Sequence, residues 1–398
     1  MLWQRAMARR LTNWLESHLE YTVPRSESPI SYHLWGGISA LSCAMQRRCC
    51  VEWDVGHLYP NMYIALIGPT GGRKGGPIEE VRRYMYRVRL PTMGERNTPE
   101  AVIQDLTRAE ALYKDHETDR FLIHSSISGT VHELSVFLGE GERDFLAALT
   151  DWYDSRVVWR NNTKHVGRDH IVGVCVGILA GSTPDWLPKS ITKEAVKGGF
   201  IGRWLFIVEY GRRKAMSVHS LPPRNLALYE DLIHDLREIK EVYGTFSLTK
   251  DAKDWYDPWY LNEDGKDKII NDPMLHGYYE RRAAHLHKLA MTVAIAESNE
   301  LVLHKKHFLK ALELLESVEK QMGGAFVAIG PVRYLDEQRM VEELIQSRGT
   351  ISKAELLIEC DRIVDYYILQ QIELNLTGRG VVEVTRDPIG YKWKGLPT

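Results

Sequence analysis

The sequence predicts an α/β fold, and three observations carry this prediction. A buried apolar strand is expected at residues 62–67, and a glycine-rich turn and a helix at residues 78–88 follow it directly. Further apolar strands are expected at Ile171–Gly181 and Arg203–Glu209, with helical connections between them. Continuous runs of β-branched and other apolar residues are typical of strands that are buried on both faces of a parallel sheet.

Length and composition indicate a globular chain of two or three domains. Its 398 residues are too many for one small core, and 44% hydrophobic and 26% charged residues are ordinary values for a folded protein. The formal charge of −2 excludes a polycation, so any contact with nucleic acid requires locally clustered basic residues.

Cysteine usage and hydropathy indicate a cytoplasmic protein without a membrane span. The five cysteines form no C-x-x-C pair, so neither a zinc site nor a disulfide framework is favoured and a reducing compartment fits best. The longest uncharged apolar run, Ile171–Gly181, has about half of the roughly 20 residues that a membrane helix requires.

The glycine-rich turn is the most informative feature of the chain. Successive backbone N–H groups of such a turn point at an anion, the following helix presents the positive end of its dipole, and Lys74 adds a mobile charge. The turn therefore predicts a binding site for nucleotide phosphates. The residues expected to form it are Gly68, Pro69, Thr70, Gly71, Gly72, Arg73, Lys74, Gly75 and Gly76.

The turn departs from the strict phosphate-loop pattern, which asks for Gly, four residues, Gly-Lys and then Ser or Thr. Gly68 and Lys74 have the required spacing, but Arg73 replaces the second glycine. Gly75 and Gly76 stand where a hydroxyl group would hold Mg²⁺. A glycine-rich turn without a ligand is the alternative interpretation. The strand before the turn and the helix after it favour the phosphate site.

Helices are expected on either side of this turn. Two amphipathic helices, Leu2–Leu19 and Ile30–Arg47, precede it, and we interpret the first as a docking helix. A later helix is predicted to begin at Pro99, because Thr98 is a good N-cap residue and proline is favoured at the first helical position.

An acidic residue at a strand end is a candidate catalytic group. One or two core strands are expected within residues 120–139, ending at His132-Glu133. In P-loop motors such a strand ends in an acidic pair, of which one member holds Mg²⁺ and the other polarises the attacking water. Glu133 is the candidate for the second role, whereas His132 is a poor Mg²⁺ ligand. The alternative for Glu133 is an exposed glutamate at a strand end.

Two hydroxyl residues follow the apolar strand at Ile171–Gly181. Either Ser182 or Thr183 is placed to sense a γ-phosphate, and Ser182 is added to the predicted nucleotide-binding residues. The alternative is that Thr183 caps a helix beginning at Pro184, and the two roles are compatible.

From Leu226 to about Ile329 the pattern is helical, which predicts a bundle packed on the sheet. Within it, His285 and His287 are two residues apart and point to different faces of a helix. We therefore expect no shared metal ion there, and no protein-ligated metal site elsewhere.

Three short helices and a β-hairpin are expected from about Tyr334, and their order is typical of a winged helix. The helices are Asp336–Ser347, Lys353–Cys360 and Asp365–Leu376, and a turn at Arg348–Thr350 separates the first two. This fold often binds duplex DNA. A winged helix used for protein contacts is the alternative, because the third helix carries Glu373 and few cations. The candidate phosphate contacts are Arg379, Arg386, Lys392 and Lys394.

Several strings between about residues 25 and 330 resemble a known protein family. They are Ser28–Ile38, Arg47-Arg48, Tyr59–Tyr63, the Arg73-Lys74 turn, Glu133–Gly139, Thr163-Lys164, Gly181–Leu187 and Gly198–Arg203. In their order and spacing they resemble phage and mobile-element ATPases of the primase-helicase type, which have a RecA-like or AAA-type P-loop core. The winged helix lies outside this resemblance.

The resemblance implies an oligomeric ATPase of phage-type DNA replication, a hexameric ring with ATP and Mg²⁺ bound between subunits. In such assemblies a neighbour's arginine reaches the γ-phosphate and spreads the transition-state charge. Arg203 matches the family arginine after the glycine pair and is expected to be this γ-phosphate-binding arginine, the arginine finger. Lys164 and Arg160 are the next candidates for the role. The alternative is that Arg203 pairs with an acid of its own subunit. Arg281 matches a further family arginine of unassigned role.

These inferences divide the chain into an N-terminal helical region (1–55), a P-loop ATPase core (56–220), a helical region on the core (221–332) and a winged-helix domain (333–398). The expected function is an ATP-driven helicase or translocase on single- or double-stranded DNA, which also contacts other replication proteins. Its catalytic residues would be Lys74, Glu133 and Arg203. The alternative is a weakly active or inactive nucleotide switch that binds DNA as a replication or initiator protein. Two changes from the usual Mg²⁺ site favour this alternative: Gly75 replaces the hydroxyl residue, and His132 replaces the first acid of the pair. Such changes weaken hydrolysis without abolishing phosphate binding.

Overall fold

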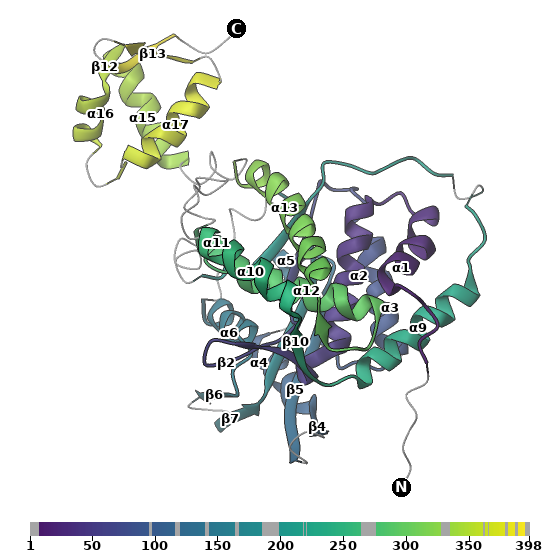
Figure 1. Ribbon diagram of the computed structural model, residues 1–398. Coiled ribbons are helices and arrows are strands. Elements are labelled where there is room, and N and C mark those ends of the chain that lie inside the picture. Colours follow the sequence, from purple (N-terminus) through teal and green to yellow (C-terminus); the bar gives the residue numbers. More distant parts are fainter. Residues whose placement is uncertain are drawn as a thin grey trace. The chain divides into compact units, whose positions relative to one another are not determined.

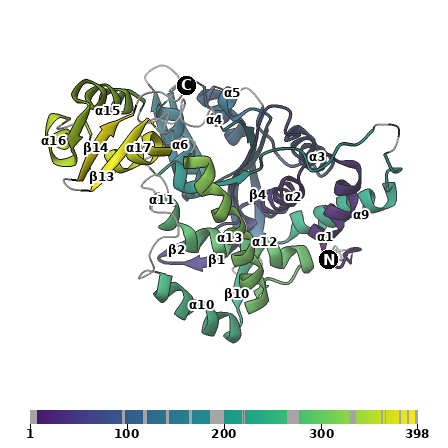
Figure 2. The same ribbon diagram turned by 90° about the horizontal axis from the view of Figure 1, so that it is seen from above.

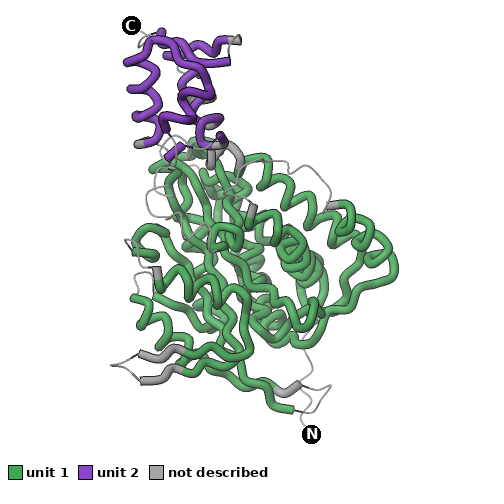
Figure 3. The backbone as a smooth tube through the Cα atoms, turned by 90° about the vertical axis from the view of Figure 1, so that its left-hand side faces the viewer, with its two compact units in different colours: residues 1–323 green, residues 324–398 purple. Residues whose placement is uncertain are grey.

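The computed structural model describes residues 8–94, 98–115, 120–139, 143–163, 167–184, 199–217, 219, 221–263, 276–327, 335–360, 363–364, 366–378, 381–386 and 389–394. The chain divides into two compact units, residues 1–323 and residues 324–398 (Figure 3). The first unit therefore contains the first two predicted domains and most of the third, and the predicted winged-helix domain lies in the second unit. None of the described helices combines the length and the apolar character that a membrane span requires.

The first unit mixes helices and strands along its whole length (Figure 1). Its elements, in chain order, are α1 (Trp14–Thr22), η1 (Val23–Arg25), α2 (Ile30–Met45), η2 (Gln46–Arg48), β1 (Cys49–Trp53), β2 (Gly56–Leu58), β3 (Tyr63–Ile67), α3 (Gly75–Arg87), α4 (Pro99–Arg108), β4 (Glu110–Asp115), β5 (Arg120–Val131), α5 (Leu134–Leu138), α6 (Arg143–Tyr153), β6 (Val158–Thr163), β7 (Gly167–Val172), β8 (Val174–Ser182), η3 (Ile201–Arg203), β9 (Trp204–Val208), α9 (Leu226–Glu241), β10 (Gly244–Leu248), α10 (Lys250–Glu263), α11 (His276–Tyr279), α12 (Arg282–Glu297), β11 (Val302–Leu303) and α13 (Lys305–Val327).

A five-stranded sheet in the order β4-β5-β8-β3-β9 forms the centre of this unit. β5, β8, β3 and β9 run parallel, and β4 is antiparallel to β5. Every residue of β3, β8 and β9 is buried, which confirms the mixed α/β fold. The neighbouring strands β3 and β8 have connections that leave in opposite directions, because the chain passes from β3 towards β4 and β5 on one side and from β8 to β9 on the other. In open α/β sheets, ligands bind at the carboxyl ends of strands at such a point.

Helices cover this sheet, and α2 is buried along most of its length (Figures 1 and 2). It packs against α1, α3, α9 and α12 as well as against β8. Most of its residues are buried, and its sequence contains glycine and alanine at close crossings. At Gly37, a Cβ atom would lie 2.7 Å from the His18 ring, so α1 approaches α2 to a distance that only glycine permits.

Most of the expected elements occur within two or three residues of their predicted bounds. α2, β3, α3 and β9 are confirmed, and α4 begins at Pro99 with the Thr98 hydroxyl accepting the Ala101 amide. The predicted apolar strand at 171–181 is divided, because Gly173 has φ +63° and separates β7 from β8. The helix that Thr183 would cap lies outside the described residues.

The prediction of an entirely helical region after Leu226 is wrong in one respect. β10 and β11 fall within it and belong to a second sheet, in the order β11-β10-β1-β2. β10 pairs in parallel with β1, with Val51 opposite Phe246. These strands are short, and their partners lie 195 positions away in the chain for β10 (Cys49 opposite Gly244) and 55 positions away for β11 (Ser247 opposite Val302), so local sequence patterns do not identify them.

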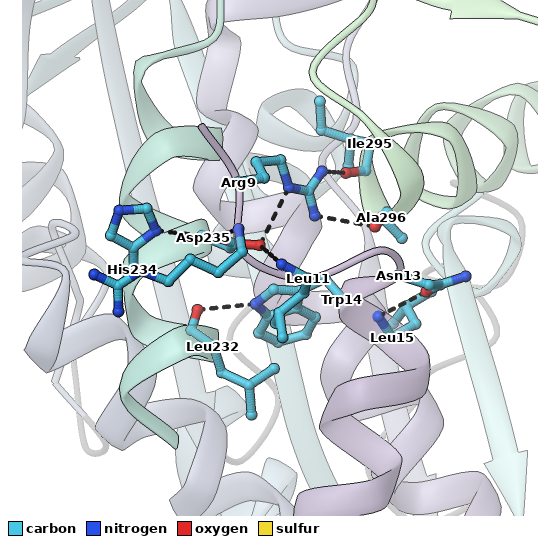
Figure 4. Close-up of polar contacts among 11 residues, drawn as sticks. Arg9, Leu11, Asn13, Trp14, Leu15, Leu232, His234, Asp235, Ile295 and Ala296 are labelled. Carbon is cyan, nitrogen blue, oxygen red and sulfur yellow. Dashed lines mark hydrogen bonds and ion pairs between the residues drawn. The ribbon is translucent and has the colours of Figure 1, made fainter. Parts of the chain in front are cut away.

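The helix expected to begin at Leu2 begins instead at Trp14. Asn13 caps it, because its side chain accepts the amides of Leu15 and Glu16. The Trp14 indole donates to the carbonyl of Leu232 in α9 at 2.9 Å (Figure 4). Residues 1–7 lie outside the described residues.

The segment before α1 joins α9 to the end of α12 (Figure 4). The fully buried carboxylate of Asp235 in α9 accepts the amides of Arg10 and Leu11 at 2.8 and 2.9 Å. The Arg9 guanidinium donates to the carbonyls of Ile295 and Ala296, in the last turn of α12. A cation at a helix C-terminus complements the helix dipole, so this contact stabilises the packing of both helices.

The second unit contains α15 (Leu335–Arg348), β12 (Thr350–Ser352), α16 (Lys353–Glu359), α17 (Tyr366–Gly378), β13 (Val382–Arg386) and β14 (Ile389–Trp393). The three helices and the hairpin occur as expected. The predicted turn after Arg348 leads directly into β12, which pairs with β14 and makes the sheet three-stranded, in the order β12-β14-β13. Buried aliphatic residues of all three helices and the sheet form one core.

The Asp235 contacts predict a large loss of stability on truncation. We expect Asp235→Ala to lower the free energy of unfolding by about 3–5 kcal/mol, because it leaves two partly buried amides and Arg9 without their carboxylate. Urea denaturation followed by tryptophan fluorescence measures this loss. Asp231→Ala is the matched control, because Asp231 pairs with Arg10 at the surface of the same helix and its loss should cost less than about 0.5 kcal/mol. Equal losses in the two variants would contradict the role of Asp235.

Candidate phosphate-binding site

The glycine-rich turn connects the carboxyl end of β3 to the first residue of α3. The Gly68 amide donates to the Ser182 carbonyl, which fixes the start of the turn beside β8. The Gly72 amide donates to the Pro69 carbonyl at 2.9 Å and closes a tight turn. Gly71 adopts φ +79°. The predicted residues 68–76 are therefore contiguous at the switch point of the sheet, next to a helix N-terminus.

Gly68 allows α2 to approach this turn closely. A Cβ atom at Gly68 would lie 2.5 Å from the Tyr32 hydroxyl oxygen and 2.9 Å from the Glu209 carbonyl. The Tyr32 hydroxyl in turn donates to the Ile67 carbonyl at 2.7 Å. Any larger residue at position 68 would separate α2 from β3 and displace the turn.

Lys74 lies over the turn and contacts it directly. Its ammonium group donates to the carbonyls of Gly68 and Pro69 at 2.7 and 3.0 Å. Partial burial lowers the pKa of Lys74, and the charge of Glu133 opposes that shift. The ammonium group is thus held at the turn by carbonyl oxygens, which a phosphate oxygen can replace with a stronger, charge-assisted hydrogen bond.

Two segments flank the start of α3. The Ser28 hydroxyl donates to the Arg73 carbonyl at 2.7 Å and lies 3.6 Å from the position of a Cβ atom on Gly76. The His132 ring lies 3.4 Å from the position of a Cβ atom on Gly75. The site is therefore bounded by Ser28 before α2 and by His132 after β5. Sequence reasoning assigned no role at the site to Ser28, although it lies in a string that carries the family resemblance.

Glu133 and Ser182 occupy different environments at the same sheet edge. Glu133 precedes α5, its side chain makes no capping hydrogen bond, and its charge acts on Lys74. Ser182 is fully buried, and its hydroxyl donates to the Thr183 carbonyl. Its carbonyl, rather than its hydroxyl, supports the turn. Glu133 is thus placed beside the turn, whereas the Ser182 hydroxyl is withdrawn from it.

Arg203 is held inside its own chain, as in the alternative interpretation. Its guanidinium donates to both carboxylate oxygens of Asp154, at 3.2 and 2.5 Å, and to the Gly199 carbonyl, and its side chain is only 6% exposed. It precedes β9, at the amino ends of the parallel strands and so opposite to the turn. The Asp154 side chain is 41% exposed, so the pair is only partly buried. Within its own chain Arg203 therefore has a bidentate carboxylate partner that it would have to leave to reach a neighbouring subunit, and the arginine finger stays a prediction.

The other candidates for an arginine finger differ in their surroundings. Arg281, at the start of α12, is half-buried near Arg203, and burial lowers its pKa. Arg160 is exposed on β6. Lys164 lies outside the described residues.

The positions that hold Mg²⁺ in the phosphate-loop pattern do not carry suitable ligands here. Gly75 offers no hydroxyl, the imidazole of His132 takes the place of a first acid, and the hydroxyls of Ser28 and Ser182 already donate to carbonyls. Mg²⁺ prefers several oxygen ligands. Within the described ranges, no group of three or more His, Cys, Asp and Glu side chains is arranged to hold a metal ion.

Most cations of the second unit that the structure describes are paired. Lys394 lies 3.1 Å from Glu383 and Lys353 lies 3.0 Å from Glu373. Lys392 is exposed on β14. Arg379 and the side chain of Arg386 lie outside the described residues. The described side chains alone therefore do not form an unpaired basic surface of the size that DNA binding usually requires.

The chain matches no protein-family model and no curated protein.

The internal pairing of Arg203 is testable by a double-mutant cycle with Asp154. We expect Arg203→Ala to lower the urea midpoint of the isolated chain. The double variant should lose less than the sum of the single losses, with a coupling of about 0.5–3 kcal/mol, because both changes remove one ion pair. Arg160→Ala is the control for an exposed arginine. An unchanged midpoint for Arg203→Ala would contradict a stabilising role of the pair within the chain.

Proposed function

We propose that this protein binds the triphosphate of ATP at the turn between β3 and α3. The observation that carries the proposal is the placement of Lys74 against the carbonyls of a glycine turn that opens directly into a helix. The amides of Gly75 and Gly76 belong to the first turn of α3 and have no acceptor within the helix. Together with Lys74 they offer several donors and a positive helix end to one anion.

The architecture of both units supports a DNA-associated member of the P-loop ATPases. A strand that lies between β8 and β9 and leads through a glycine turn into a helix suits a core of the RecA-like or AAA type. Three helices followed by a β-hairpin suit a winged helix in the second unit. We propose DNA as the partner of that unit and an oligomer as the working form.

Two observations favour a nucleotide switch over a motor. Glycine stands at position 75, where the phosphate-loop pattern has the hydroxyl that holds Mg²⁺, and Arg203 is engaged by Asp154 within its own chain. Both features remove groups that stabilise the charge of phosphoryl transfer. The motor remains the second candidate because Glu133 lies within electrostatic reach of Lys74, where a water-activating carboxylate belongs.

Nucleotide binding at the turn is testable through Lys74. We expect Lys74→Ala to weaken ATP binding by at least about tenfold, because it removes one charge-assisted contact to phosphate. Isothermal titration calorimetry measures the affinity. Lys253→Ala is the matched control, since Lys253 is an exposed lysine of α10. Unchanged affinity in Lys74→Ala would remove the basis of the proposed function.

ATP turnover with and without DNA distinguishes the switch from the motor. For the switch, we expect ATP and DNA binding, with turnover at background level both in the parent protein and in Glu133→Gln, because the groups that stabilise the transition state are missing. Phosphate release at saturating ATP and Mg²⁺, with single- and double-stranded DNA, is the measurement. DNA-stimulated turnover that disappears in Lys74→Ala and in Glu133→Gln would instead establish the motor.

A further inference from the structure

Arg73 adopts a backbone conformation that is unusual for its residue type. Its φ of +62° is left-handed, and it occupies the position at which the phosphate-loop pattern has glycine. A left-handed conformation is energetically unfavourable for a residue that has a Cβ atom. The Ser28 hydroxyl, which donates to the Arg73 carbonyl, helps to hold this conformation. The turn thus carries a guanidinium group at a position where the backbone conformation would suit glycine better.

The guanidinium group of Arg73 is held by Glu27. Its Nε atom lies 2.7 Å from Glu27 Oε2, while the other carboxylate oxygen of Glu27 accepts the Met216 amide at 2.7 Å. Arg212 approaches the same carboxylate at 3.8 Å. The Met216 hydrogen bond and then the charge of Arg73 lower the pKa of Glu27, so its side chain is ionised at neutral pH.

This pair is exchangeable, because Glu27 has other partners and the Arg73 side chain is half exposed. The Arg73 side chain is about half exposed, at 53%, and belongs to the same turn as Lys74. If Arg73 leaves, Glu27 keeps the Met216 amide and the nearby Arg212, so no buried charge is left without a partner. Exposed pairs of this kind contribute little stability. A phosphate group that offers two oxygens can therefore compete with Glu27 for Arg73.

We propose that Arg73 is a second cationic ligand of the triphosphate, which it binds after release from Glu27, and that the turn thereby accepts a nucleoside triphosphate without Mg²⁺. This inference rests on the proposed function and adds to it the metal-free form of the ligand. In ordinary phosphate loops Mg²⁺ bridges two phosphate groups and neutralises their charge. Here the hydroxyl that would hold the ion is replaced by Gly75, and the adjacent pair Arg73-Lys74 supplies two positive charges at the helix end.

Negative groups also face the turn, and they limit how tightly an anion binds. Glu27 lies on the Ser28 side and Glu133 lies on the His132 side, where its charge acts on Lys74. Removing the charge of Glu27 should therefore strengthen phosphate binding by freeing Arg73, whereas removing the guanidinium group should weaken it.

The experiment measures the affinity for a fluorescent ATP analogue in EDTA and in Mg²⁺. We expect the parent protein to bind in EDTA within about tenfold of its affinity in Mg²⁺, because Arg73 and Lys74 take over the charge of the ion. Arg73→Gly restores the ordinary pattern and removes the backbone strain. We expect it to lose at least about tenfold in EDTA and to recover most of the loss in Mg²⁺. Glu27→Gln keeps an oxygen for the Met216 amide and should bind more tightly in EDTA.

Controls separate a local effect from misfolding. Arg83→Ala removes an arginine of α3 that pairs with Glu79 and Glu80 outside the turn, and its affinity should equal that of the parent protein in both buffers. Thermal melting without nucleotide verifies that each variant is folded. Arg73→Gly should melt at or slightly above the parent temperature, because it relieves the left-handed conformation.

The outcomes distinguish this inference from the proposed function. If the parent protein binds the ATP analogue only in Mg²⁺, and Arg73→Gly has the same affinities as the parent protein in both buffers, the proposed role of Arg73 is wrong. The proposal that the turn binds a nucleotide is then unaffected. If the parent protein binds in neither buffer, the proposed function itself fails. Equal affinities of Arg73→Gly and the parent protein in EDTA would also overturn the inference.

Discussion

The parallel pairing of β3 with β8 on one side and β9 on the other is the constraint on which the rest of the first unit depends. This register places Ile67 opposite Ser182 and Val208, so three strand ends meet at one edge of the sheet. The turn leaves the sheet there, and its first amide is fixed by the Ser182 carbonyl. Because the same pairing puts the start of β9 at the opposite edge, it also separates Arg203 from the turn.

The edges of the site come from segments that are remote in the chain. The residues before α2 reach Arg73 through Glu27 and Ser28, and the connection after β5 brings His132 to the start of α3. The N-terminal segment in turn is fixed by Asp235 and by the last carbonyls of α12, which secures the helices behind the sheet. The turn is thus held by hydrogen bonds from several elements, whereas Arg73 remains exchangeable.

Much of the fold was predictable, because its main elements have strong local patterns. The apolar run of β3, the capping pair Thr98-Pro99 and the three helices and hairpin of the second unit all occur close to their expected bounds. The misses have a common cause. β10, β11 and β12 are short strands that are defined by hydrogen bonds to partner strands remote in the chain. The residues before α1 are held in a non-helical conformation by hydrogen bonds to Asp235.

The sequence by itself determined that a glycine turn with one lysine joins a buried strand to a helix, since glycine content, apolar runs and helix caps are local properties of the chain. Only the tertiary structure decided which side chains meet at that turn and which are withdrawn from it. Arg203 pairs with Asp154, the Ser182 hydroxyl is buried, and Arg73 is bound to Glu27. These outcomes depend on strand register and on contacts between residues far apart in the chain, and no local pattern encodes such distances.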